Sequence, residues 1–401
     1  MSAFSALVRK RSDSGSSWVT RDVLTLLLAQ LLFGFAWSMY LLLPKFYTNA
    51  LGVGPELLGQ ISATGGVAGL LAVPFAGYGL DRLGRVFFFR LGVVFVIVMS
   101  VGFMTVERVG FLLYALHAMF MAAFVFSYNG AAALITDYAP PEHMGRAIGW
   151  LGGAHVLMNA GASIVAEPLS MNYGWNTVFV LGGVMGGLTL LLSLRLRESE
   201  RAPVQPDSAV RGRGIGVPVQ TLPLLLVTVV VGATFIAMFS FVQPYALSLG
   251  AMEIRSFLIG HSISAVGCRL ILGGAGDRFG RDLVSAVAMA GYTLCALCMV
   301  GLEIDLLLLY GLLFGAAHGV LYPTLNALFS QAMPSSQRGL SMALFNGAFN
   351  LGGVAGGWGC GQLVASYGYP RLYQWVALLT LAGVATLLVL WGRRLRAVAR
   401  S

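Results

Sequence analysis

Six ionisable residues interrupt stretches of sequence that are otherwise apolar. They are His117, His155, Glu167, His261, Arg269 and His318. Ionisable side chains inside a bilayer are costly and are therefore candidates for function by default. An imidazole can bind and release a proton near neutral pH. The candidates for coupling are Glu167, His117, His318 and Arg269. Each histidine fits equally well as a hydrogen-bonded packing residue.

A second set of charged residues lies in a motif that occurs twice. The segment G-Y-G-L-D-R-L-G-R at 77–85 recurs 196 positions later as G-G-A-G-D-R-F-G-R at 273–281. The shared positions are Gly77, Asp81, Arg82, Gly84 and Arg85 in the first copy, and Gly273, Asp277, Arg278, Gly280 and Arg281 in the second. A charged turn that is duplicated between apolar stretches predicts a membrane protein built from two similar halves.

Composition places the chain in a lipid bilayer. Of its 401 residues, 57% are hydrophobic and only 10% are charged, whereas soluble domains average about 25% charged residues. Because a spanning helix needs roughly 20 apolar residues, the length admits about a dozen helices and short loops. The sequence therefore predicts an all-α integral membrane protein.

Apolar stretches separated by charged residues or by clusters of Gly, Pro and Asn predict twelve transmembrane helices. They cover residues 23–43, 57–80, 86–106, 110–136, 147–169 and 177–194, followed by 222–247, 256–276, 283–302, 306–333, 340–364 and 372–391. The polar stretch between the two groups, rich in Arg and Pro, predicts a flexible linker. The expected organisation is a six-helix bundle over 1–194, a linker over 195–221 and a second six-helix bundle over 222–401.

The distribution of Lys and Arg predicts the orientation, because cytoplasmic loops carry the excess of these residues. With the N-terminus inside, twenty of the 25 basic residues fall in inner segments and four in outer loops. This predicts a cell-membrane protein with both termini and the linker in the cytoplasm. The same asymmetry accounts for the net charge of +9, so we expect no nucleic-acid partner.

A second pair of matching segments follows the spans 110–136 and 306–333. They read T-D-Y-A-P-P-E-H-M-G-R-A at 136–147 and Q-A-M-P-S-S-Q-R-G at 331–339. With these segments and the doubled G-x-x-x-D-R-x-G-R motif, the chain resembles the major facilitator superfamily over its whole length. In pattern it is most similar to twelve-helix drug and arabinose efflux proton antiporters. The resemblance implies two pseudo-symmetric bundles that open alternately to the two sides.

The duplicated motif has a physical interpretation at the inner face. The spans 147–169 and 340–364 begin there, and a helix N-terminus presents unpaired N–H groups and a partial positive charge. Asp81 can dock on the start of span 340–364, and Asp277 on the start of span 147–169. The resemblance implies that these contacts form an inner gate favouring the outward-open state. Alternatively, the charges only fix the topology.

The resemblance also implies that the spans 23–43, 110–136, 222–247 and 306–333 line a central cavity. The candidate cavity residues are Trp37, Tyr40, His117, Tyr128, Asn129, Gln243, His318, Tyr322 and Asn326. This aromatic and mostly uncharged set favours hydrophobic substrates, whereas Arg269 and Lys45 would suit an anion.

Two of the embedded ionisable residues have no obvious partner in sequence. Glu167 precedes Pro168 where efflux antiporters of the superfamily usually carry a G-x-x-x-G-P-x-x-G-G pattern, of which only the proline is present. Near the outer mouth, Glu167 is a possible proton site with His261 as its partner. Arg269 has three possible partners: helix-end carbonyls, Asp277 or an anionic substrate.

These observations predict a secondary transporter, with proton-coupled efflux of small hydrophobic organic compounds as the first hypothesis. The alternatives are a proton-coupled uptake symporter for a small carboxylate or other nutrient, and a non-transporting membrane receptor. An enzyme is not expected, because the chain has neither an H-E-x-x-H nor a G-x-S-x-G motif. We expect no cofactor or metal, and the expected partners are a small-molecule substrate, protons and lipid. We expect the protein to be a monomer.

Overall fold

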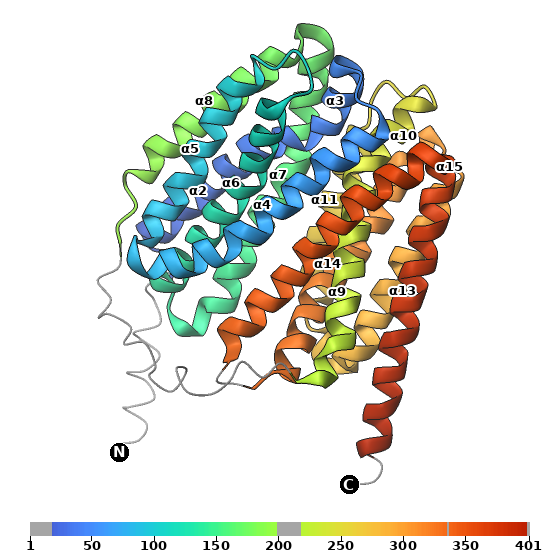
Figure 1. The fold of residues 1–401 in the computed structure, drawn as a ribbon. Coiled ribbons are helices and arrows are strands. Elements are labelled where there is room, and N and C mark those ends of the chain that lie inside the picture. The colour runs from blue at the N-terminus through green and yellow to red at the C-terminus, as the bar shows by residue number, and fades with distance from the viewer. Residues whose placement is uncertain (1–17, 199–217, 335–336, 399–401) are drawn as a thin grey trace, which may run out of the picture.

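The computed structural model describes residues 18–198, 218–334 and 337–398, and within these ranges it is a bundle of helices without strands. Figure 1 shows the N-terminal half, in blue to green, beside the C-terminal half, in yellow-green to red. Of the predicted linker 195–221, residues 199–217 lie outside the described part of the chain.

The helices alternate in direction through each half. The N-terminal half contains α2 (Arg21–Ser38), α3 (Leu43–Leu51), α4 (Pro55–Arg82), α5 (Arg85–Phe103), α6 (Phe111–Tyr138), α7 (Met144–Tyr173) and α8 (Trp175–Ser193). The C-terminal half contains α9 (Leu222–Ile236), α10 (Val242–Ser248), α11 (Arg255–Leu272), α12 (Ala275–Phe279), α13 (Arg281–Val300), α14 (Leu307–Ala332) and α15 (Arg338–Val398).

Ten helical segments in the described residues are long and apolar enough to cross a membrane. The last of them contains a break at Gly368, where φ is 79° and ψ is 170°, and Figure 1 shows α15 turning back on itself. The 18-residue helix α11 packs between α7 and α14 but is not among the ten. The all-α membrane fold is therefore confirmed, and twelve crossings follow only if α15 counts twice and α11 is included.

The backbone repeats between the halves. The six glycines with positive φ form three pairs, Gly52 with Gly250, Gly84 with Gly280, and Gly174 with Gly368, each separated by 194 to 198 positions. Residues other than glycine pay a steric penalty at these angles. The last glycine of each copy of the duplicated motif thus has a structural reason, since it turns the chain between two helices.

The first long helix of each half is interrupted at an equivalent place. A 3-10 turn, Met39–Leu42, separates α2 from α3, and a π turn, Ala237–Phe241, separates α9 from α10. Such turns change the direction in which the following side chains point, and they leave backbone carbonyls without their helical partners. Both interruptions lie toward the same end of the bundle.

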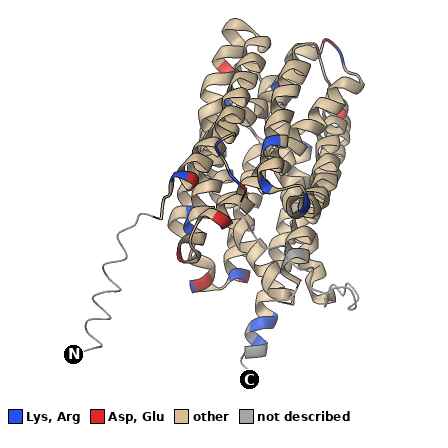
Figure 2. Ribbon diagram, turned by 90° about the vertical axis from the view of Figure 1, so that its left-hand side faces the viewer, with Lys and Arg blue, Asp and Glu red and all other residues tan. Residues whose placement is uncertain are grey.

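We name the ends of the bundle by the predicted orientation. At the inner end α2 begins and α15 ends, and at the outer end lie α3 and α10 (Figure 1). Figure 2 shows tan ribbon over most of the bundle and basic residues on the last turns of α15. Large apolar side chains such as Leu71 and Ile271 are exposed on the sides, as expected of a surface that faces lipid.

The halves meet along two seams. In one, α7 packs against α11; in the other, α4 packs against the first part of α15. The second seam is very close at the outer end, because a methyl group added at Gly59 would lie 2.6 Å from the Gly357 carbonyl oxygen and 2.8 Å from Gly361 Cα. Glycines that face each other in this way allow helix backbones to touch.

Candidate functional site: a polar contact at the outer end and a chamber between the halves

Glu167 lies at the outer end of the α7–α11 seam and is fully buried. Its Oε1 is 2.5 Å from the Nζ of Lys45, whose side chain is 5% exposed. Lys45 belongs to α3, which begins at Leu43 with Pro44 in its first turn. A buried ion pair stays together because removing one partner leaves a charge without compensation.

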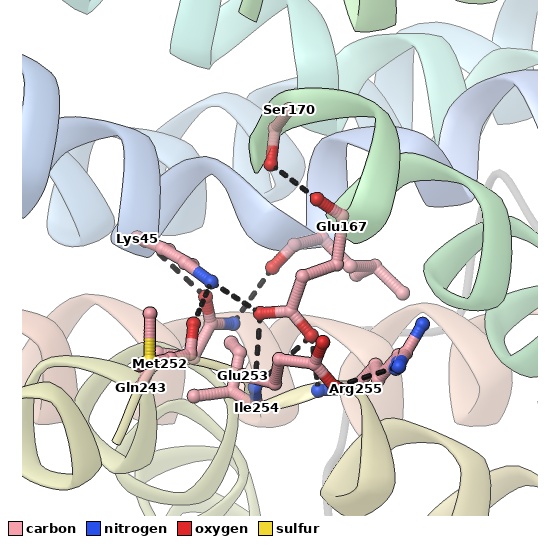
Figure 3. Close-up of polar contacts among 9 residues, drawn as sticks. Lys45, Glu167, Ser170, Gln243, Met252, Glu253, Ile254 and Arg255 are labelled. Carbon is pink, nitrogen blue, oxygen red and sulfur yellow. Dashed lines mark hydrogen bonds and ion pairs between the residues drawn. The ribbon is translucent and has the colours of Figure 1, made fainter. Parts of the chain in front are cut away.

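The same carboxylate closes the start of a helix in the other half. The amide of Ile254 donates to Glu167 Oε1 at 2.9 Å and to Oε2 at 3.0 Å, and the amide of Arg255 donates to Oε2 at 2.7 Å. Ile254 is the N-cap residue of α11, so Glu167 supplies negative charge to the positive end of that helix. Figure 3 shows Glu167 extending from α7 between Lys45 and this segment.

Gln243 completes the contact between the halves. Its side-chain amide donates to Leu41 O at 2.7 Å, in the irregular turn that precedes α3, and its oxygen accepts from the amide of Lys45 at 3.3 Å. The Nζ of Lys45 also donates to Met252 O at 2.6 Å. We call this set, Lys45, Glu167, Gln243, Met252, Ile254 and Arg255, the outer latch. Gln243 was a predicted cavity residue, and the structure places it here.

At the inner end, the side-chain contacts that Arg85 and Arg281 of the duplicated motif make stay within each half. Arg85 pairs with Asp137 and donates to Ala133 O at 3.0 Å. The equivalent Arg281 donates to Ala327 O at 3.4 Å and pairs with Asp277 at 2.7 Å. The reason for the difference is that Asp137 corresponds to Gln331 in the second half, which offers no charge.

The predicted contact of Asp277 with the start of α7 is not formed in this conformation. The Asp277 side chain is 72% exposed and bonds to Arg281 on the following helix rather than to the start of α7. Asp81 ends α4 together with Arg82, but its side chain lies outside the described residues. The guanidinium of Arg82 lies 4.2 Å above the ring of Tyr78, and that of Arg278 lies 5.1 Å from the ring of Phe279. The role of these residues as a gate stays a prediction.

A cavity of about 410 Å³ separates the halves toward the inner end. It lies between α4 and the beginning of α15 and reaches α6. Its walls are Leu70, Val73, Pro74, Gly77, Leu80, Asn129, Met342, Ala343, Leu344, Asn346 and Gly347. The predicted motif residue Gly77 and the predicted cavity residue Asn129 thus line the same cavity. At the outer end, by contrast, α4 and α15 are in contact and leave no such space.

The other predicted cavity residues do not line this space, and three of them pack within their own half. Tyr40 turns into the N-terminal half, where its hydroxyl is 2.5 Å from Ser100 Oγ and its ring stacks on Phe179. Trp37 donates to Phe120 O at 2.8 Å. Asn326 accepts a long bond, 3.5 Å, from Ser330. These three residues are fixed by neighbours in their own half.

The four histidines of the spans differ in their partners. His117 Nδ1 is 3.0 Å from the hydroxyl of Tyr47, and His318 Nδ1 is 2.5 Å from that of Tyr292. His155 makes a longer contact, 3.4 Å, with Gln30. His261 makes no hydrogen bond through either ring nitrogen among the described residues. The centre of its ring lies 5.9 Å from the centre of the His318 ring. Glu167 is therefore paired with Lys45 and not with His261.

Arg269 lies deeper in the α7–α11 seam than the outer latch. Its Nε is buried and has no hydrogen-bond partner among the described residues. Two groups converge beside Gly152 of α7, where an added methyl group would lie 3.1 Å from the Tyr128 hydroxyl and 4.0 Å from Arg269 Nη1. Tyr322, from α14, donates to Asn346 Oδ1 at 3.0 Å. We call Arg269, Tyr128, Gly152 and Tyr322 the central chamber.

Sequence reasoning named Lys45 only as a residue that would suit an anionic substrate; it missed Lys45 as the partner of Glu167 and missed the start of α11 as part of a site. The only available signal was a lysine one residue beyond a proline that itself follows a predicted span, which is compatible with an ordinary loop. Gly152 was likewise missed, because its role depends on which side chains from other helices approach it.

Comparison with known proteins agrees with this architecture. A family model described as Major Facilitator Superfamily matches residues 26–300 and 224–400. The multi-drug resistance efflux pump PmrA of Streptococcus pneumoniae is 27% identical over 256 residues, which cover 61% of this chain and 63% of the pump. The match thus spans less than two thirds of that relative's length.

A shorter match joins the chain to the 4-hydroxybenzoate transporter PcaK of Acinetobacter baylyi, with 31% identity over 107 residues, or 26% of this chain and 23% of the transporter. Among solved structures, the nucleoside transporter NupG superposes with a TM-score of 0.79 at 13% identity, covering 92% of this chain and 99% of NupG. That identity supports the fold alone. The family match extends over nearly the whole described chain, and the protein is therefore a member of the major facilitator superfamily, an integral membrane transporter family.

Proposed function

We propose that the protein is a proton-coupled secondary transporter that exports small hydrophobic organic compounds by alternating access. One observation carries the proposal: the halves are joined at the outer end, where the buried Glu167–Lys45 pair of the N-terminal half accepts from the amides of Ile254 and Arg255 and donates to Met252 O, and they are separated by a cavity toward the inner end. A protein that transports by alternating access must be able to close one end while the other is open.

Glu167 gives protons a means of acting on this arrangement. As a carboxylate it holds Lys45 and the two amides at the start of α11. A protonated carboxyl group loses the attraction to Lys45 and to the helix N-terminus, and both are charge-assisted contacts. Proton uptake at Glu167 should therefore open the outer end, and proton release should close it.

The direction of transport rests on the relatives. PmrA is named as a multi-drug resistance efflux pump, and the mostly apolar walls of the cavity between the halves suit apolar substrates. The second candidate function is uptake of a small carboxylate, favoured by the unpaired Arg269 and by the relative named as a 4-hydroxybenzoate transporter. Flux measured in proteoliposomes under an imposed pH gradient, with lipophilic dyes and small carboxylates, separates the two.

Closure of the outer end can be measured by cross-linking. The side-chain amide of Gln362 donates to Glu56 Oε1 at 3.0 Å across the α4–α15 seam at this end. A protein carrying Glu56→Cys and Gln362→Cys, with the four native cysteines replaced by serine, should form a disulfide readily at high outer pH. Lowering the outer pH should reduce disulfide formation several-fold, because protonation of Glu167 releases the latch.

Glu167→Gln should make this response disappear. The variant should cross-link poorly at every pH and should lose dye export driven by a pH gradient. Glu253→Gln is the matched control, because Glu253 is a nearby acid that is 43% exposed and pairs only with Arg255. If Glu167→Gln cross-links and exports like the control, Glu167 is not the proton-sensitive element and the proposal fails.

A further inference from the structure

Arg269 lies between the two halves and forms no ion pair with any acid in the part of the chain that the structure describes. The carboxylates of Glu167, Asp137, Asp277 and Asp282 each pair with another basic residue: Lys45, Arg85, Arg281 and Arg394, respectively. Arg269 lies 14 residues after Arg255 on α11, or about 21 Å from the outer latch at 1.5 Å per residue. An embedded arginine that forms no ion pair is costly unless an anion reaches it.

The surroundings of Arg269 belong to both halves. Tyr128 of α6 and Arg269 of α11 approach the same point on α7, and they can do so because Gly152 has no side chain there. A phenol and a guanidinium can both donate hydrogen bonds to one carboxylate, and guanidinium is suited to planar, bidentate recognition. A ligand held by both groups would contact both halves of the transporter at once.

The walls beside this point are aromatic. The ring of Tyr128 stacks on Phe124 at 5.3 Å, and the ring of Tyr322 lies 5.7 Å from His318. The chamber therefore combines one cationic group with flat apolar faces, which suits a ring that carries an acidic group.

The inner cavity supplies a route to this chamber. Asn346, which accepts the hydrogen bond of Tyr322, lines the cavity of about 410 Å³, as does Asn129, the neighbour of Tyr128 in sequence. A small molecule that enters between α4 and α15 from the inner end thus arrives beside the tyrosines.

We infer that Arg269 and Tyr128 bind the acidic group of an aromatic monoanion, whose ring lies against Tyr128 and Tyr322. This inference rests on the proposed transport function and makes it more specific: the substrate is an apolar ring that carries one negative charge. The charge is recognised in the α7–α11 seam, and the ring is recognised by residues of both halves.

Equilibrium binding to the purified protein tests the inference without relying on flux. The probes are benzoate and 2-naphthoate, each compared with its neutral amide, by isothermal titration. We expect the wild type to bind the acids at least 10-fold more tightly than the amides. Because a hydrogen bond to a charged group contributes about 1.5–3 kcal/mol, Arg269→Gln should weaken acid binding about 10- to 100-fold and leave amide binding nearly unchanged.

Two further variants guard against a folding defect. Gly152→Ala keeps every charge but fills the point where the two donors meet, and it should also weaken acid binding. Arg371→Gln, which removes an exposed arginine bonded to Gln374, should bind like the wild type. Equal affinity of the wild type for acids and amides, or unchanged acid binding in Arg269→Gln, overturns the inference. If the wild type binds the acids more tightly than the amides but does not export dyes, the result would instead count against the transport proposal.

Discussion

Glu167 shows how one side chain can serve two structural purposes. It neutralises Lys45 and caps α11, and these partners come from opposite halves of the molecule. The carboxylate is fully buried, so each contact depends on the other. With the α11 amides in place but no lysine, the carboxylate would be a buried charge that is only partly compensated.

The interdependence leads to a prediction for Lys45→Gln. This variant leaves Glu167 charged and should destabilise the closed protein by about 3–5 kcal/mol, whereas replacing both residues by glutamine should cost less than Lys45→Gln alone. The midpoint of thermal unfolding in detergent, measured for the two single variants and the double variant, checks this. Additive effects of the two substitutions would show that the ion pair is not coupled.

Residue types were predictable from the sequence, but their partners were not. Glu167 and Arg269 were identified because ionisable residues are rare in the spans. Lys45 was assigned to a loop because the predicted span ended at residue 43. In the structure the helical chain continues through the 3-10 turn at Met39–Leu42 into α3, which contains Lys45. An irregular turn rotates the residues around it relative to a regular helix. Tyr40 lies in the 3-10 turn and Gln243 directly follows the π turn, so a regular helical pattern could not predict the direction in which these two side chains point.

At the scale of helices, the sequence predicts the number and place of most elements within a few residues. The spans 86–106 and 283–302, for example, correspond to α5 and α13. The α4–α15 seam, by contrast, depends on glycines for which the sequence offers no partner. Which of the many glycines touch across the seam is decided by helix rotation, and the sequence of one chain does not specify it.

This seam provides a prediction with a control on the same helix. A methyl group at Gly357 would lie 2.6 Å from the amide nitrogen of Ala63, whereas one at Gly359 would have no neighbour within 4 Å. Gly357→Ala should destabilise the protein by about 1–3 kcal/mol through overpacking and should reduce cross-linking between Glu56→Cys and Gln362→Cys. Gly359→Ala should change neither quantity. Equal behaviour of the two variants would mean that α4 and α15 are not in close contact at the outer end.

At the scale of the whole molecule, the sequence predicts two matched halves, and the three pairs of positive-φ glycines agree with that prediction. It does not predict which end is closed. Closing one end instead of the other requires the halves to move relative to each other while most contacts within each half are kept. The same pattern of hydrophobic residues therefore fits both the state closed outside and the state closed inside. The latch and the inner cavity appear only when the halves are placed together.

Orientation in the membrane is a further prediction at this scale. A membrane-impermeant maleimide should label Glu107→Cys in intact cells, since Glu107 precedes α6 at the outer end. It should label Ser401→Cys only after the membrane is permeabilised, because the excess of basic residues keeps the C-terminus inside. Both variants are made in the cysteine-free background. The reverse labelling pattern would show that the topology is inverted and that the outer latch lies at the cytoplasmic end of the protein.

Glu167 corresponds, 194 positions later, to Gly361, which packs against the backbone of Pro55 and Gly59. Of the two seams, the α7–α11 seam therefore contains the carboxylate of Glu167, whereas the α4–α15 seam is built on touching glycine backbones, with the Glu56–Gln362 contact at its outer end. We expect separation to start beside α7 and α11 and to reach the contact between α4 and α15 afterwards. The entrance would then first widen along one lateral edge, and a compound wedged into that edge would block transport without ever occupying the substrate's place.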